Sequence, residues 1–119
     1  MDIQEMVKKA HDNAVNHGFW DPPLDFGTAI ALIHSELSEA LEEKRQGNPD
    51  VWFKETNGFM VSDPKEWRGK KPEGVAVELA DAVIRIADLC GHLGIDLGAA
   101  IEMKMAYNEG RPYKHGKQF

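Results

Sequence analysis

Apolar residues recur at helical spacing in four segments of the chain, each bounded by residues that start or stop helices. The segments are about residues 2–17, 28–46, 74–93 and 97–109. The predicted N-caps are Asp2, Thr28 and Asp96, and the predicted stops are Gly18, Gly47, Gly94 and Gly110. The pattern predicts an all-α fold, a bundle-like domain of four to five helices.

The second segment has one apolar face at about 100° per residue. Its members are Ile30, Ile33, Leu37, Ala40 and Leu41. Glu36, Glu39 and Glu43 fall along the edge of that face. An acidic helix edge is ordinarily a solvated surface, and this interpretation competes with a functional one here.

The third segment is apolar around most of its circumference, which is typical of a helix buried between partners. Its polar residues form one narrow stripe: Glu78, Asp81, Arg85, Asp88 and His92. Arg85 can form an ion pair with Asp81 or Asp88 along the helix. Glu78 and Asp81, three positions apart, have little reason to occur on so apolar a helix unless they bind something.

The fourth segment is expected to place Ala100, Ile101 and Met105 toward the core. Lys104 and Asn108 share another face of this helix, and Arg111 follows just past its end. The C-terminal residues RPYKHGKQF are basic and predict a loop.

Two irregular segments connect the helices. Residues 19–27 contain two prolines and several aromatic residues, and predict a packed, non-helical connection. Residues 48–73 contain the turn signals Asn48-Pro49, Asn57-Gly58, Asp63-Pro64 and Lys71-Pro72. Because this segment is also rich in aromatic residues, it predicts a long ordered loop with a short hairpin or helical turn.

The composition is that of one soluble domain, residues 1–119, with 42% hydrophobic and 29% charged residues. A net charge of −6 disfavours a partner of polymeric nucleic acid. Cys90 is the one cysteine, so no disulfide is expected, and its apolar surroundings predict a buried thiol. Without a signal peptide or a membrane-spanning run, a cytoplasmic location is expected.

Four carboxylates carry the candidate chemistry: Glu36 and Glu39 in one helix, Glu78 and Asp81 in another. The two residues of each pair are three positions apart and so share a helix face. If the two helices pack together, all four carboxylates meet. Such a group repels itself unless cations or raised pKa values relieve it. Oxygen ligands favour Mg²⁺, with Mn²⁺ as a substitute, and Mg²⁺ recruits phosphate oxygens.

Other metal and nucleophile chemistries fit less well. A di-iron bundle uses Glu-x-x-His motifs, and no helical Glu here has a His at that spacing. Ser35, Ser38 and Cys90 have no adjacent base motif, and the chain has no Walker-type phosphate loop.

The motifs resemble those of the MazG-like all-α NTP pyrophosphohydrolases. The sequence SELSE (35–39) resembles the family's EExxE motif, with Ser35 in place of its first Glu, and ELAD (78–81) resembles its ExxD motif. The sequence KMAYNEGRPYKHGK (104–117) resembles its Lys–Asn–Arg helix end. The resemblance covers about residues 28–117, and the segment between the acidic motifs is longer than is usual in the family.

The resemblance implies Mg²⁺-dependent hydrolysis of a nucleoside triphosphate to the monophosphate and pyrophosphate. The metal ligands would be Glu36, Glu39, Glu78 and Asp81. Glu39 would also orient or deprotonate the attacking water. Lys104, Asn108 and Arg111 would bind the triphosphate or the sugar.

The resemblance also implies a homodimer or homotetramer in which a second copy completes the core, with the substrate site near the subunit boundary. The apolar third segment supports the same expectation. Two alternatives stay open: a non-catalytic helical oligomer that binds a structural or regulatory cation, and an enzyme restricted to dUTP or dCTP.

Overall fold

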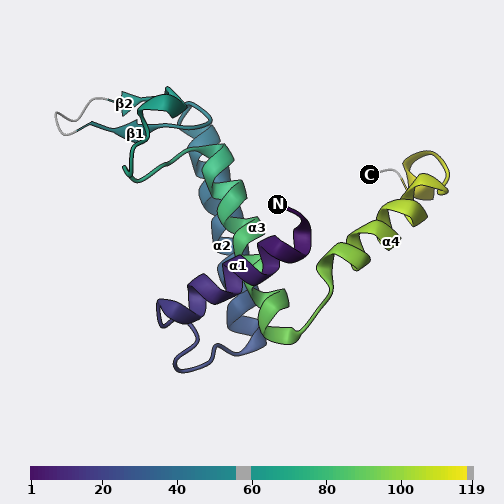
Figure 1. Cartoon of the computed structure of the whole chain (residues 1–119). Coiled ribbons are helices and arrows are strands. Elements are labelled where there is room, and N and C mark those ends of the chain that lie inside the picture. Colours follow the sequence, from purple (N-terminus) through teal and green to yellow (C-terminus); the bar gives the residue numbers. More distant parts are fainter. Residues whose placement is uncertain (56–59, 118–119) are drawn as a thin grey trace.

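The computed structural model describes residues 1–55 and 60–117 and is mostly helical (Figure 1). The helices are α1 (Ile3–Asn16), α2 (Phe26–Arg45), α3 (Val75–Leu93) and α4 (Leu97–Glu109). The strands β1 (Phe53–Lys54) and β2 (Met60–Val61) and the 3₁₀ turns η1 (Pro64–Glu66) and η2 (Tyr113–Gly116) are short. This content agrees with the predicted all-α class.

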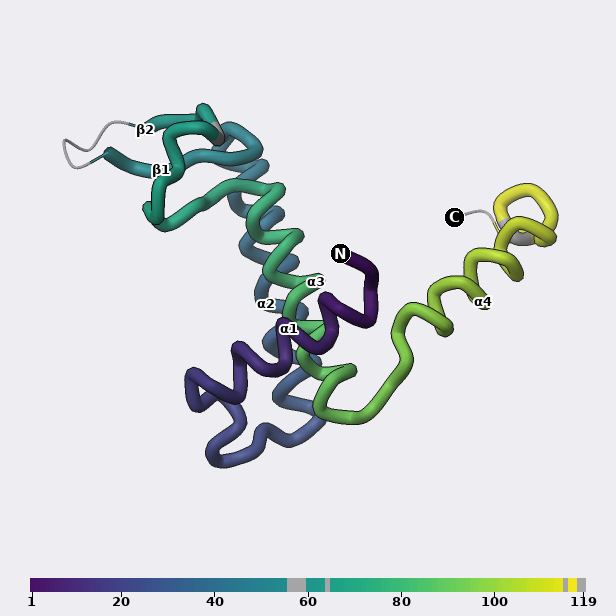
Figure 2. The backbone as a smooth tube through the Cα atoms, viewed as in Figure 1, coloured from purple at the N-terminus to yellow at the C-terminus, as the bar shows by residue number. Residues whose placement is uncertain are grey.

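Helices α2 and α3 pack along each other, and α1 crosses α3 (Figure 2). One apolar cluster, Val7, Ala87 and Cys90, joins α1 to α3, and the Cys90 thiol is buried as predicted. A second cluster, Ala29, Ile33 and Leu89, joins α2 to α3.

The predicted helix ends are largely confirmed. The carboxylates of Asp2 and Asp96 each accept a hydrogen bond from the third residue after them, and Gly94 ends α3 with a φ of 71°. Thr28 was wrongly expected to cap α2. Asp25 caps it instead, because its carboxylate accepts hydrogen bonds from both the backbone N–H and the hydroxyl of Thr28, so the helix begins earlier, at Phe26.

The segment 48–73 was predicted to contain a short hairpin or a helical turn, and the structure has both a strand pair and a 3₁₀ turn there. Strands β1 and β2 are antiparallel, with Phe53 opposite Val61 and fully buried. Trp52 exchanges two backbone hydrogen bonds with Glu73, which attaches the hairpin to the start of α3. The predicted Asn57-Gly58 turn lies outside the described residues.

Helix α4 differs from the expectation. It packs against α1 only near its start and then projects away from α2 and α3 (Figure 1). Ala100 and Met105, expected to face the core, are exposed, and no residue of α4 is buried. Among the described residues, only α1 packs against α4, near its start, so most of α4 is left uncovered.

Apolar surface is also exposed on the central helices. On α3, Leu79, Val83 and Ile86 follow one another at helical spacing and are between 37% and 46% exposed. Leu37 and Leu41 of α2, predicted on the packed face, are 48% and 59% exposed. The single chain therefore leaves uncovered part of the apolar surface that its sequence provides; oligomerisation remains a prediction.

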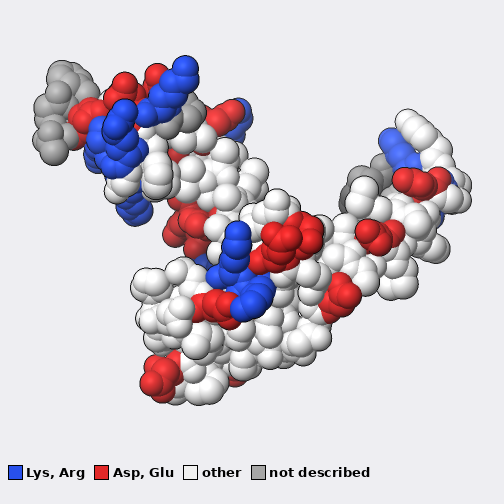
Figure 3. All heavy atoms as spheres, in the orientation of Figure 1, with Lys and Arg blue, Asp and Glu red and all other residues white. Residues whose placement is uncertain are grey.

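The charged side chains are distributed unevenly over the surface. On the face in view, basic side chains gather at the β1–β2 end and in a smaller group near the middle, beside acidic ones (Figure 3). No basic band runs the length of this face among the described residues. None of the helices that the structure describes is long and apolar enough to cross a membrane.

Candidate metal centre

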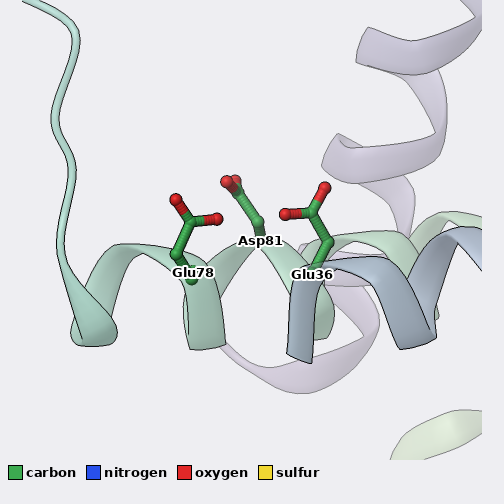
Figure 4. A group of neighbouring side chains, drawn as sticks. All are labelled: Glu36, Glu78 and Asp81. Carbon is green, nitrogen blue, oxygen red and sulfur yellow. The ribbon is translucent and has the colours of Figure 1, made fainter. Parts of the chain in front are cut away.

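Glu36, Glu78 and Asp81 form a carboxylate cluster between α2 and α3 (Figure 4). One oxygen from each lies within 4.8 Å of the others. Glu78 and Asp81 are three positions apart on α3 and so point the same way, and the packing of α2 on α3 places Glu36 beside them. The structure thus brings together three of the four predicted ligands.

Glu36 is the most buried member of the cluster. It was expected at the edge of the apolar face of α2, but it is 8% exposed and lies on the packed face with Ile33 and Ala40. The reason is its neighbour across the interface: Arg85 of α3 donates from Nε to Glu36 Oε1 at 2.8 Å. The ion pair expected for Arg85 within its own helix is therefore replaced by one between helices.

The three pKa values diverge because the carboxylates share one site. Burial raises the pKa of Glu78 to about 7, and hydrogen bonding with Glu39 and Glu36 and the charges of Glu39 and Asp81 add to this. Burial also raises the pKa of Asp81, with a contribution from the charge of Glu36. Burial alone would raise the pKa of Glu36 too, but hydrogen bonding with Arg85 and Glu78 outweighs it and the pKa is lowered.

Glu39, the fourth predicted ligand, lies beside this cluster rather than within it. It is exposed, yet close enough to Glu78 to raise the pKa of that carboxyl group. Glu39, Glu78 and Lys71 line an open hollow of about 280 Å³ on one side of the cluster. Glu39 can therefore reach a ligand held at the cluster from the solvent side.

The donor set fits a hard divalent cation. All the ligand atoms are carboxylate oxygens, and they come from two packed helices, α2 and α3. Glu78 Oε2 is buried and has no hydrogen-bond partner among the described residues. A buried carboxylate oxygen without a partner is costly, and a bound cation would satisfy it.

The predicted substrate-binding residues lie elsewhere in the chain. Lys104 and Asn108 are on α4 and Arg111 follows it, on the projecting arm of the molecule (Figure 1). Lys104 and Arg111 both approach the exposed ring of Tyr107, at 4.9 and 5.3 Å from its centroid. The three residues lie along the C-terminal half of α4 and just past it, on an arm that extends away from the helices that carry the carboxylates (Figure 1).

Asp88, the next member of the polar stripe on α3, has a structural role that the sequence did not reveal. Its Oδ1 accepts a hydrogen bond from Trp20 Nε1 at 2.8 Å and lies 2.9 Å from His11 Nδ1. The Trp20 ring stacks on His92 at 3.9 Å. These contacts tie α1 and the segment after it to α3, and they account for His92 without a metal.

The chain was compared with models of known protein families, with curated proteins and with solved structures, and none of the three comparisons gives a match.

Proposed function

We propose that the protein is a Mg²⁺-dependent pyrophosphohydrolase that converts a nucleoside or deoxynucleoside triphosphate to the monophosphate and pyrophosphate. The observation that carries the proposal is the cluster of Glu36, Glu78 and Asp81, whose oxygens converge within 4.8 Å. Two of these carboxylates, Glu78 and Asp81, have raised pKa values. Without a cation this arrangement is unfavourable, and perturbed carboxylates of this kind are typical of functional sites. Such an enzyme would serve nucleotide-pool housekeeping in the cytoplasm.

The residues have separate tasks in this proposal. Glu36, Glu78 and Asp81, with Glu39 beside them, would hold Mg²⁺ or Mn²⁺. A bound cation of this kind neutralises phosphate charge and lowers the pKa of a coordinated water. Glu39, being exposed next to Glu78, would orient the attacking water and accept its proton.

The position of α4 favours completion of the site by a second copy of the chain. Helix α4, which carries Lys104 and Asn108 and precedes Arg111, extends away from the helices that carry the carboxylates (Figure 1). Asn108 Oδ1 is buried without a partner among the described residues. The exposed stripe of Leu79 and Val83 provides an apolar surface for association. We therefore assign the α4 residues to a triphosphate held by the partner's carboxylates, in a homodimer or homotetramer.

One observation favours the non-catalytic alternative, a helical oligomer that binds a structural cation. Arg85 already occupies Glu36 Oε1 at 2.8 Å, which leaves fewer carboxylate oxygens to hold a catalytic metal together with a triphosphate. A protein of this kind would gain stability from Mg²⁺ but would process no nucleotide.

Two measurements on one preparation separate these functions. The first is the melting temperature with and without Mg²⁺, and the second is pyrophosphate release from a panel of ribo- and deoxyribonucleoside triphosphates. If the protein is the enzyme, Mg²⁺ raises both the melting temperature and the release of pyrophosphate. If it is the structural protein, Mg²⁺ raises only the melting temperature. The panel also decides whether activity is confined to dUTP or dCTP.

A further inference from the structure

A second hollow adjoins the carboxylate cluster, on the side opposite the hollow lined by Glu39, Glu78 and Lys71, which we call the acidic hollow. It has a volume of about 230 Å³ and lies where α1 crosses α3. Glu36 and Asp81 form one wall, so the hollow and the cluster share two carboxylates. In Figure 4, α1, the pale purple ribbon, passes beside the Glu36 end of the cluster.

The lining of this second hollow differs chemically from that of the acidic hollow. Ala10 and Ala14, four positions apart on α1, leave the space open because their side chains are small. Phe19, with its aromatic ring, is 65% exposed, and Ile84 is 48% exposed. Half of the lining is thus apolar and half is polar or charged. Apolar and aromatic surface combined with placed polar groups is typical of a site for a small organic ligand.

Two polar side chains add directional hydrogen bonding. Asn13 lines the hollow with an exposed amide, which offers one acceptor and two donor hydrogens. Arg85 uses Nε for Glu36 and is 41% exposed, so its guanidinium also borders the hollow. An amide can pair with the donor and acceptor groups at the edge of a nucleobase, and a guanidinium can donate to a sugar or phosphate oxygen.

We propose that this hollow binds the base and sugar of the nucleotide, with Phe19 stacking on the base and Asn13 selecting it by hydrogen bonds. The inference rests on the proposed function, because the cluster between the two hollows would then hold the metal and the phosphates. The triphosphate would extend toward Glu78 and Lys71, in the acidic hollow. Base preference would therefore be set on α1 and the turn after it, outside the motifs that carry the family resemblance.

Stacking is tested with Phe19→Ala. Removing the ring should raise KM about tenfold and change kcat less than about twofold, because the base is bound alike in the ground and transition states. Phe19→Tyr should retain the KM of the wild type. Phe26→Ala is the matched control: Phe26 is also exposed, at 60%, but does not line the hollow, so KM should not change.

Base selection is tested with Asn13→Asp. Cytosine carries an amino group where uracil carries a keto oxygen, and a carboxylate can accept from the first but cannot donate to the second. The ratio of kcat/KM for dCTP over dUTP should rise about tenfold. The added negative charge affects both nucleotides alike and cancels in the ratio. Asn16→Asp, the same change at the end of α1 and outside the hollow, should leave the ratio unchanged.

The outcomes separate this inference from the proposed function. If the wild type releases pyrophosphate but Phe19→Ala and Asn13→Asp behave like their controls, the base subsite is overturned and the enzyme assignment survives. If size-exclusion chromatography shows that Phe19→Ala dissociates a wild-type oligomer, a second copy covers the hollow, and the inference is also overturned.

If no nucleotide is hydrolysed, the proposed function fails. Equilibrium binding of a nucleotide analogue then decides whether the hollow binds a base. The probe is an α,β-methylene deoxynucleoside triphosphate with Mg²⁺, measured by calorimetry. The base subsite survives only if the wild type binds the probe and Phe19→Ala binds it about tenfold more weakly. No binding to the wild type overturns it.

Discussion

Arg85 Nε donates a 2.8 Å hydrogen bond to Oε1 of Glu36, and this ion pair links α3 to the most buried carboxylate of the protein's acidic cluster. The Glu36 side chain is 10% exposed, whereas that of Arg85 is 41% exposed, so the pair lies at the boundary between core and solvent. One guanidinium thus allows a carboxylate to remain ionised on the packed face of α2.

Replacing Arg85 by Met should destabilise the metal-free protein, because Glu36 would keep its buried charge without a partner. We expect the free energy of unfolding to fall by about 1–3 kcal/mol. Denaturant unfolding in EDTA measures the change. Glu36→Gln in the same background should recover part of the loss; if the two substitutions are simply additive, the ion pair does not stabilise the fold.

The pKa of Glu78 predicts how stability depends on pH. The folded protein holds this proton up to about pH 7, whereas the unfolded chain releases it near 4.5. The stability that the group contributes is therefore full below pH 4.5 and is lost as the pH rises through 7, a decrease on the order of 2–3 kcal/mol. Unfolding in EDTA between pH 5 and 8 should show this decrease for the wild type, and Glu78→Gln should reduce it.

Mg²⁺ should reverse that trend, because the cation binds only the deprotonated carboxylate. The rise in melting temperature that Mg²⁺ causes should accordingly be larger at pH 8 than at pH 6. Glu5→Gln, the same change at an exposed carboxylate in the first turn of α1, should respond like the wild type. An equal Mg²⁺ response in Glu78→Gln would place the cation elsewhere.

The crossing of α1 over α3 depends on Gly91. A Cβ atom at this position would lie 2.5 Å from Cβ of His11, so the helices could not keep their separation. Gly91→Ala should lower the free energy of unfolding by about 1–3 kcal/mol. Gly98→Ala is the control, since its new Cβ would meet only ordinary contacts, the nearest at 3.7 Å. Equal stability of the two variants would show that the close approach is not required.

The exposed apolar stripe on α3 predicts association. Val83→Arg should convert the oligomer to a monomer in light scattering and abolish activity, because a charge is costly to bury in an apolar interface. Val15→Arg provides the control, since Val15 of α1 is 49% exposed against 46% for Val83. A wild type that is monomeric at micromolar concentration would contradict the prediction.

Mixed oligomers test whether α4 acts on the partner's carboxylates. Glu78→Gln and Lys104→Ala chains should each be inactive alone. In a statistical mixture of dimers, a shared site should restore about one quarter of the wild-type activity, because half of the dimers carry one intact site. A site formed within one chain should restore none.

The sequence predicted those features that depend on local chemistry. Asp96 caps the start of α4 and Gly94 ends α3, both as expected, because capping is decided by a few neighbouring residues. The pairing of Glu78 with Asp81 likewise follows from helix geometry alone. Features that depend on neighbouring helices were predicted less well.

Glu36 shows why tertiary features were missed. Its position along α2 placed it at the edge of an apolar face, and only the approach of Arg85 from α3 explains its burial. Met105 shows the converse: helical spacing marked it as inward, but it is 60% exposed, and no helix of the described chain lies opposite it. Helical periodicity identifies an apolar side of a helix but not the partner that covers it.

The most direct measurement is ³¹P NMR of a nucleoside triphosphate incubated with the protein and Mg²⁺. We predict that the wild type and Glu5→Gln produce the monophosphate and pyrophosphate, and that Glu78→Gln loses at least about a hundredfold in rate because the metal site is incomplete. Glu78→Gln cleaving as fast as the wild type, or a wild type that leaves every nucleotide of the panel intact, would contradict the account.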